Sequence, residues 1–457
     1  MLLSGDIRSY RINKVTRVVS VPPDFTIGIV LPLLYSSSTD LPSTESLDNR
    51  GVPYEVDENE SITVYYIVSK EFDWESNYDS ILSPDTLARV VVDYLYSVGA
   101  NFVAAIVPFD VSGDSAGIYA NLKVPFEISK NPDDKEFLKR DIDFILVAFP
   151  EPQTVDNSDN SGSNDVEGFK SFLDAVRDHI VVCSNKLLPA LDESSSGSRI
   201  GQLERYFIFG ISPTRPDLMW SAYDSFKSNP DASRRVVMLT GNYPFAYLPG
   251  VLGKFGGRYV HTYSSRSYDF TWSLAGLPFV IQYLTSGDLA MPLTNKPIGG
   301  ISLAGDRVGT LKMSEFYNNY GACLLISDYS QGTPTCYRSN TIAYGVNKNG
   351  GEGHLYSYPE DVEFTVMFLE DTMDKINRDY LRRFRGQKMN NSMLKTIEEN
   401  FKKYVLDDYL YAKRWIVEYR NLNLYIDKND PTILRGYYEY RPVYPINRIW
   451  IEHFFIV

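Results

Sequence analysis

The chain has 457 residues, of which 44% are hydrophobic and 14% aromatic, and its formal net charge is −13 at pH 7. This composition excludes a disordered chain, and the length predicts two to four packed modules. The acidic balance argues against nucleic acid as the main partner, because phosphate binding needs clustered lysine and arginine. Cys183, Cys323 and Cys336 stand in no metal or redox spacing and predict reduced thiols in a protein folded in the cytosol.

Neither a membrane span nor a signal peptide is expected. The most apolar stretch, 273–284, has 12 residues and contains Pro278 and Gln282, so it is too short to cross a bilayer. The first residues lack the charged stretch and apolar core of a signal peptide. We therefore expect a protein that is not secreted by that route.

Residues 7–20 have the composition of a strand but no clean apolar face, and they carry four basic side chains. Such a segment would make a poor core strand. It predicts either an edge strand guarded by charge or an arm that pairs elsewhere.

From about residue 25 to 260, short apolar runs alternate with helical patterns. We predict strands and helices in alternation, which indicates an α/β layer with strands buried on both faces. The predicted strands are 61–68, 102–109, 143–149, 205–211 and 235–240, and the predicted helices are 86–98, 168–188 and 217–228. Surface loops are predicted at 39–59, 153–165 and 192–198, which are rich in serine and acidic residues.

Beyond residue 260 the pattern changes. Residues 268–303 are rich in proline and predict loops, whereas 360–385 and 392–424 predict helices. The tail 434–457 is strand-rich and ends on apolar residues, so its end is expected to be buried. The tail could lie in its own sheet or add to a neighbour's sheet, and the pattern alone favours its own sheet.

A basic region interrupts the acidic chain. Nine basic and three acidic residues lie between Lys375 and Lys403. On a helix, Arg378, Arg382 and Arg385 share one face, which predicts either a docking surface for an acidic partner or a solvated helix face. The residues assigned to this basic region are Lys375, Arg378, Arg382, Arg383, Arg385, Lys388 and Lys395.

One motif suggests catalysis. Residues 113–117 (GDSAG) match the G-x-S-x-G pattern of hydrolase nucleophiles, which needs a buried strand before it and a helix after it. Residues 118–128 are interpreted as extended, so an ordinary turn is favoured over a nucleophile at Ser115. The histidines and cysteines have no metal-ligand spacing, so neither a catalytic site, a metal site nor a cofactor is expected.

The last third resembles the core of contractile tail sheath proteins. Residues 311–326 (LKMSEFYNNYGACLLI) are similar to the family segment in which a leucine-asparagine pair precedes a strand, and 338–341 to its arginine-threonine signature. Residues 292–305 resemble the proline- and glycine-rich approach to that region. Residues 360–424 resemble the family's helical section, and 437–457 its closing strand.

Three features depart from the family pattern. Cys323 stands where the family often has asparagine, Arg338 is separated from Thr341, and a basic-tryptophan segment before the helical section is missing. The resemblance covers about residues 275–457, and the region before about 260 carries no motif of the family.

The resemblance implies a structural protein and not an enzyme. Subunits of this family stack as six-membered rings into a helical tube around a tail tube, and they exchange terminal strands with their neighbours. The implied fold is α/β (α+β overall), with a conserved core domain built from the C-terminal third plus the N-terminal arm. The expected parts are a linking arm 1–22, a variable α/β outer region 23–262, the core 263–436 and a C-terminal linking strand 437–457.

The resemblance also implies roles for residues and partners. The basic region would face the tail tube, and the two ends of the chain would link subunits. The linking residues would be Ile12, Val15, Val18, Tyr440, Pro442, Pro445, Ile446, Ile449, Ile451, Phe455 and Val457. The implied partners are neighbouring sheath subunits, the tail tube protein, the baseplate and the tail terminator, with no direct contact to nucleic acid or membrane and no cofactor.

In a bacteriophage, the implied place is the tail of the virion, assembled in the cytoplasm of the host bacterium. Contraction would drive the tube through the host envelope for genome ejection. Alternatives are the sheath of a type VI secretion or bacteriocin-like injection system, another tail component, and, more remotely, an α/β hydrolase that uses Ser115.

Overall fold

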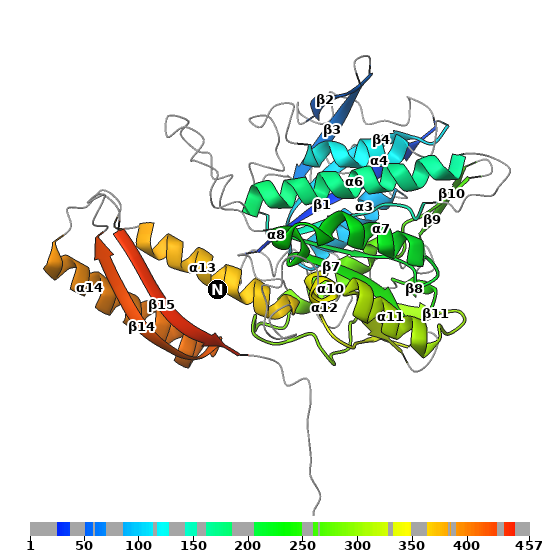
Figure 1. The fold of residues 1–457 in the computed structure, drawn as a ribbon. Helices are drawn as coiled ribbons and strands as arrows, with labels where there is room; N and C mark the ends of the chain where they lie inside the picture. The colour runs from blue at the N-terminus through cyan, green and yellow to red at the C-terminus, as the bar shows by residue number, and fades with distance from the viewer. Residues whose placement is uncertain are drawn as a thin grey trace, which may run out of the picture.

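The computed structural model describes residues 25–36, 51–57, 60–69, 86–112, 117–127, 142–152, 161–184, 205–248, 259–263, 266–327, 332–348, 363–382, 384, 390–426 and 434–443. A large sheet with helices on both faces forms the body, and a smaller unit of helices and a hairpin stands beside it (Figure 1). The α/β fold class predicted from the sequence is confirmed.

The body is built on one mixed sheet in the order β13-β12-β7-β6-β5-β1-β4-β3-β2. The strands are β1 Thr26–Tyr35, β2 Gly51–Asp57, β3 Glu60–Val68, β4 Asn101–Asp110, β5 Phe144–Val147, β6 Tyr206–Gly210, β7 Val236–Gly241, β12 Cys323–Ile326 and β13 Thr335–Cys336. The run from β12 to β4 is parallel, whereas β2, β3 and β13 pair antiparallel. The parallel strands β5, β6 and β7 are buried at every residue, as their continuous apolar runs predict.

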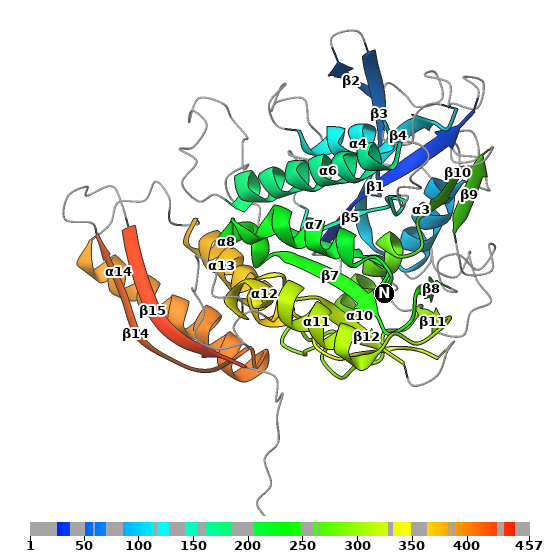
Figure 2. The same ribbon diagram turned by 45° about the vertical axis from the view of Figure 1, so that its right-hand side comes forward.

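Two layers of helices cover the sheet (Figures 1 and 2). One layer contains α4 Gly117–Lys123, α6 Ser161–Ser184, α7 Pro216–Lys227, α8 Pro230–Ser233, α11 Thr310–Tyr320 and α12 Ala343–Lys348. The other contains α3 Leu87–Ser97 and α10 Gly276–Leu284, which follows the short helix η5 Ser273–Ala275. Short elements complete the body: η2 Val124–Phe126 and the strand pairs β8 Phe245–Tyr247 with β11 Ser302–Ala304 and β9 Val260–Tyr263 with β10 Arg266–Asp269.

Glycines allow α10 to lie directly on the sheet. A Cβ placed on Gly276 would lie 2.5 Å from the backbone oxygen of Ile208 in β6. A Cβ on Gly210 would collide with the backbone oxygen of Trp272. Only residues without a side chain permit this close approach of helix to strand.

The smaller unit is the C-terminal part of the described chain. It consists of α13 Phe364–Arg382, α14 Asn391–Phe401, the π-helical turns Lys402–Leu406 and Asp408–Ala412, and the antiparallel strands β14 Ile416–Ile426 and β15 Leu434–Pro442. In both views α13 runs from the body into this unit (Figures 1 and 2). No helix in the ranges described above is long and apolar enough to span a membrane.

The large sheet extends across the expected boundary at residue 262, because β12 and β13 belong to the same sheet as β1–β7. The chain passes from the body to the smaller unit along α13. Two of the predicted loops were wrong. The predicted loop 39–59 contains β2, and the predicted loop 153–165 contains the start of α6. The predicted loop 192–198 lies outside the described residues.

Three secondary-structure predictions were also wrong. The proline-rich region 268–303 contains the buried helix α10. Residues 416–424, the end of the predicted helix 392–424, belong to the strand β14. Residues 118–128, predicted as extended, contain α4 and η2, where Pro125 is tolerated because it lies in the first turn of a 3₁₀ helix.

Candidate assembly surface

The first half of α13 is fixed to the body by aromatic packing. Phe364 and Phe368 are buried, and the ring of Phe368 stacks on Phe144 of β5 at a centroid distance of 4.8 Å. Tyr206 of β6 meets Phe368 edge-on at 5.3 Å, and Tyr283 of α10 does so at 5.5 Å. Such pairs add stability beyond the area that they bury, so this end of α13 behaves as part of the body.

A buried ion cluster fixes α13 one turn further on. Arg235 donates to both oxygens of Asp371, from Nε at 3.1 Å and from Nη2 at 3.2 Å. Tyr206 donates to Asp371 at 2.5 Å, and Arg234 does so at 3.4 Å. Burial acts to raise the pKa of Asp371, but the charges of Arg235 and Arg234 outweigh it, and the pKa lies below its usual value.

The helix α13 also supports a separate, smaller core, through residues that alternate with those facing the body. Leu369 and Met373 pack with residues of α14, the π-helical turns and the start of β14. The buried members from those elements are Phe401, Val405, Leu406, Tyr409, Trp415 and Ile416. Asn377 links α13 to the hairpin, because its amide donates to the hydroxyl of Tyr438 at 2.7 Å. The hairpin is therefore held against a helix that is itself anchored in the body.

The strands β14 and β15 form a two-stranded sheet with an irregular register. The register shifts between Arg420 and Asn423, and Asn421 within this interval has a left-handed φ of 57°. The outer face carries ion pairs across the strands, Arg420 with Glu439 at 2.6 Å and Arg441 with Glu418 at 3.6 Å. This bulge and the surface charges are devices that keep an exposed hairpin from aggregating.

The edges of this hairpin are the feature that could join molecules. Within the described ranges, neither β14 nor β15 pairs with a further strand. One edge amide is covered, because Leu424 donates its N–H to the carboxylate of Glu398 at 3.2 Å. Exposed tyrosines and a valine flank the strands: Tyr404, Tyr411, Val417, Tyr425 and Tyr437. An unpaired strand edge is a template for an added strand.

The structure places part of the predicted C-terminal linking strand inside this hairpin. Tyr440 pairs with Tyr419, and Pro442 pairs with Ile416. Val443 still donates its N–H to the carbonyl of Trp415 at 3.0 Å. The other predicted linking residues, Ile12, Val15, Val18, Pro445, Ile446, Ile449, Ile451, Phe455 and Val457, lie outside the described residues.

The predicted basic region is divided between two helices. Lys375 lies on α13 and pairs with Asp143 of the body at 3.5 Å, so its charge is partly balanced. Lys395 is exposed on α14. The side chains of Arg378, Arg382, Arg383, Arg385 and Lys388 lie outside the described part of the structure. The prediction of a single basic face on one helix remains untested.

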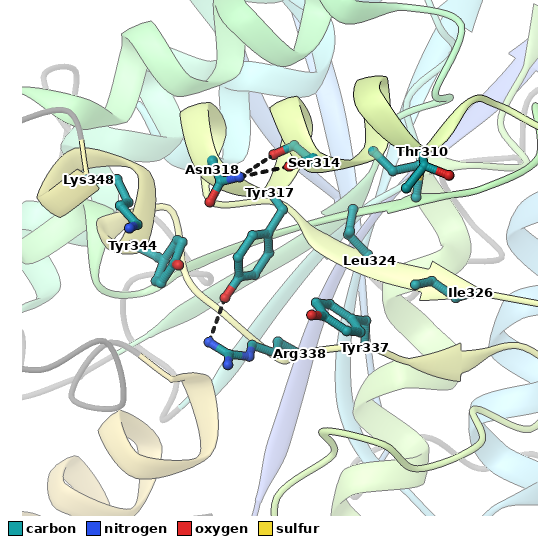
Figure 3. A pocket seen from close by; sticks show the side chains of 11 residues that line it. Thr310, Ser314, Tyr317, Asn318, Leu324, Ile326, Tyr337, Arg338, Tyr344 and Lys348 are labelled. Atoms are coloured by element: carbon teal, nitrogen blue, oxygen red, sulfur yellow. Dashed lines mark hydrogen bonds between the residues drawn. The ribbon is translucent and has the colours of Figure 1, made fainter. Parts of the chain in front are cut away.

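Two segments of the family resemblance meet around a cavity of about 490 Å³. Tyr317 of α11 and Arg338, just after β13, lie side by side, and Arg338 donates to the Tyr317 hydroxyl at 2.7 Å (Figure 3). Leu324 and Ile326 of β12 line the same cavity, as does Lys348 of α12. The lining of the cavity therefore combines apolar side chains of β12 with the basic side chains of Arg338 and Lys348.

The motif around Ser115 has a different local structure from the one predicted. A strand, β4, precedes it and a helix, α4, follows it, so the geometric objection to a nucleophile was wrong. Ser115 itself lies outside the described residues. Among the residues that the structure describes, no group of three or more histidine, cysteine, aspartate or glutamate side chains is placed to hold a metal ion.

Neither the strand β14 nor the ion cluster around Asp371, which anchors α13 to the body, was predicted from the sequence. The signal for β14 was available, because IVEYRNLNLYI is rich in β-branched and aromatic residues. The cluster around Asp371 had no local signal, because its members lie up to 165 residues apart in the chain.

No family model matches the chain, and no curated protein matches it. In structure the chain is similar to the sheath complex, in its contracted state, of the extracellular contractile injection system PVC. The TM-score is 0.48 at 10% sequence identity, with 97% of this chain and 95% of that chain covered. It is also similar to a sheath tail protein from Listeria innocua, with a TM-score of 0.42 at 10% identity and coverage of 96% and 98%. At this identity and TM-score, the likeness carries no conclusion about what this chain does.

Proposed function

We propose that the chain is a structural subunit of a contractile sheath that joins its neighbours by adding strands to the β14–β15 hairpin. The observation that carries the proposal is the hairpin itself: two strands whose outer edges pair with no other strand in the described part of the chain, held away from the body by the anchored helix α13. The order of sheath-like segments over about residues 275–457 supports the same reading.

Among the described residues, the hairpin is a sheet of only two strands. Two strands alone are marginal in water, and three or more strands, or a helix on one face, are needed for stability. Here α13 and α14 cover one face, through contacts such as Phe401 with Tyr438. Added strands from neighbouring copies would satisfy the edges, and residues 7–20 and 444–457 have the composition for that role.

The mechanism follows from this linkage. Copies would stack as six-membered rings around a tail tube, in an extended state that is metastable. On release, each body would rotate as a rigid unit into a wider and shorter lattice with more buried contact, while the exchanged strands keep the mesh connected. The energy would be stored during assembly, so the step requires no cofactor.

The finer assignment is a phage tail sheath, within a virion assembled in the host cytoplasm, with the tail tube, baseplate and terminator as further partners. The basic region of α13 and α14 is the part proposed to face the tube. The sheath of a type VI or bacteriocin-like injection machine is the second candidate, because the same linkage would serve it. Neighbouring genes for a capsid, or their absence, separate these two.

Negative-stain electron microscopy of the purified full chain tests the proposal. Striated tubes are expected for the natural sequence, and deletion of residues 444–457 is expected to abolish them. A synthetic peptide of residues 444–457 is expected to inhibit tube formation, whereas a scrambled peptide of the same composition is not. Circular dichroism and melting of the deletion variant give the matched control for folding, because β15 ends before the deleted segment.

A chain that stays monomeric at high concentration would contradict the sheath itself. Tubes that form equally well without residues 444–457 would contradict the linkage by that segment while leaving a sheath in place. An esterase activity that Ser115→Ala abolishes would instead favour the hydrolase.

A further inference from the structure

Two of the three cysteines lie side by side on neighbouring strands. Cys336 of β13 and Leu325 of β12 are register partners, and Cys323 lies two residues before Leu325 on the same face of the sheet. The Sγ atoms of Cys323 and Cys336 are 3.3 Å apart, and both side chains are fully buried. Cys183 lies on α6, in another layer of the body.

The backbone around the pair is held from both sides. Tyr337 donates its N–H to the carbonyl of Leu324 at 2.7 Å, which ties β13 to β12. On the other side, Cys336 donates its N–H to the carbonyl of Lys296 at 2.9 Å, and Asn295 donates to the carbonyl of Cys336 at 2.6 Å. A disulfide has an S–S length of about 2.05 Å, so its formation requires the two sulfur atoms to approach by little more than 1 Å.

We propose that Cys323 and Cys336 form an intramolecular disulfide when the folded protein meets a two-electron thiol oxidant such as an azodicarboxamide. One thiolate adds to the nitrogen–nitrogen double bond of the oxidant and forms a sulfur–nitrogen bond. The second thiolate attacks that sulfur and breaks the sulfur–nitrogen bond, so the disulfide forms and the nitrogens leave as the hydrazine. The two thiol protons end on the hydrazine, and both electrons pass to it.

Burial makes this reaction slow, and the short distance between the two sulfur atoms favours the disulfide between Cys323 and Cys336. Burial, the neighbouring Cys323 and the charge of Glu363 all raise the pKa of the Cys336 thiol, so the reactive thiolate is scarce. The pair therefore stays reduced in a reducing compartment and reacts where an oxidant persists. The product would pin the edge strand β13, directly before Tyr337 and Arg338 at the cavity (Figure 3). This inference does not depend on the proposed assembly.

Peptide mapping tests it on the full chain. The sequence has no lysine or arginine between Lys312 and Arg338, so one tryptic peptide, 313–338, carries both cysteines. After treatment of the folded protein with the azodicarboxamide, then alkylation in denaturant, this peptide is expected to lose two hydrogens and take up no alkyl group. Cys183 is expected to remain alkylated. Cys323→Ala and Cys336→Ala are expected to leave the remaining cysteine of that peptide alkylated.

A redox titration adds a thermodynamic measurement. The equilibrium constant for closing the disulfide, measured against dithiothreitol, is expected to be about tenfold or more larger in the folded chain than in urea, because a disulfide that fits the fold forms more readily within it. The proposal is overturned if peptide 313–338 stays fully alkylated after oxidation. It is equally overturned if the disulfides formed are intermolecular or involve Cys183, or if the folded and unfolded constants are equal.

Discussion

Arg235 pairs with two aspartates, and the burial of each aspartate decides how much its ion pair contributes to stability. Arg235 faces Asp371 at 3.1 Å and Asp231 at 3.9 Å. The side chain of Asp371 is 9% exposed, whereas that of Asp231 is 61% exposed. Removing one partner of a buried pair leaves an uncompensated charge, but an exposed pair is screened by water and salt.

Asp371→Asn is therefore expected to lower the free energy of unfolding by about 3–5 kcal/mol, because Arg235 would lose its buried counter-charge. Asp231→Asn, the matched control on the same arginine, is expected to lower it by less than about 1 kcal/mol. Urea unfolding of the three proteins measures both values. Equal effects of the two substitutions would contradict the role assigned to the buried pair.

The difference in unfolding free energy between the natural chain and Asp371→Asn depends on pH with a definite sign. The pKa of Asp371 is lowered in the fold, so its contribution is present above the unfolded pKa and is lost as pH falls through the folded pKa. The stability difference between the natural chain and Asp371→Asn should stay constant above about pH 5 and shrink in more acidic solution. A difference that grows on acidification would show the opposite sign.

At the scale of elements, apolar patterns predicted five strands of the large sheet but not its central strand β1. The strands β3 to β7 and the helices α3, α7 and α13 lie where continuous or 3.6-periodic patterns put them. The helix α10 was missed because it is buried all round and therefore has no polar face to give it a period. The position of α10 on the sheet depends on Gly276 and Gly210, where backbones from helix and strand approach closely. This approach is a feature of the tertiary structure, so no local sequence pattern shows it.

The hairpin was missed for a related reason. The strand β14 carries charged and polar residues on its outer face and a bulge at Asn421, which break the alternation expected of a half-buried strand. Its composition favours a strand, and pairing with β15 and packing on α13 and α14 decide the outcome in the fold. Tyr440 and Pro442, which the sequence assigns to the linking strand 437–457, pair with Tyr419 and Ile416 in β14.

The body and the smaller unit have separate hydrophobic cores, so we expect their local stabilities to be separable. Phe401 is buried in the small core, where its ring meets Tyr380 at 5.6 Å and Tyr438 at 6.0 Å. Phe401→Ala is expected to remove about 3–5 kcal/mol, felt mainly by the hairpin. In hydrogen exchange, amides of β14 and β15 should exchange faster, while those of β5 and β6 keep their protection.

Tyr404→Ala is the matched control, because Tyr404 lies one turn from Phe401 and is 60% exposed. It is expected to leave exchange in all four strands unchanged. Faster exchange across the whole sheet in Phe401→Ala would mean that the two cores unfold together, and α13 would then couple them more tightly than its packing indicates.

At the scale of the whole molecule, charge opposes the proposed assembly. Every copy carries a formal net charge of −13, so stacking copies brings like charges together. The basic region on α13 and α14 acts in the other direction if it meets acidic surfaces of neighbouring copies. Added salt screens both effects, with a Debye length that falls from about 30 Å at 0.01 M to about 8 Å at 0.15 M. Which effect dominates therefore fixes the direction of the salt dependence.

We expect repulsion to dominate when the chain assembles alone, because strand addition and apolar burial are nearly independent of salt whereas the net charge is large. The fraction of protein sedimented as polymer should rise between 0.01 M and 0.15 M sodium chloride. Arg420→Glu makes the net charge more negative by two units on the exposed face of the hairpin, where the ion pair with Glu439 is screened by water and salt. This variant should need more salt than the natural chain for the same sedimented fraction. A fraction that falls with salt would instead identify the basic region as a contact between copies and not only a surface for a tube.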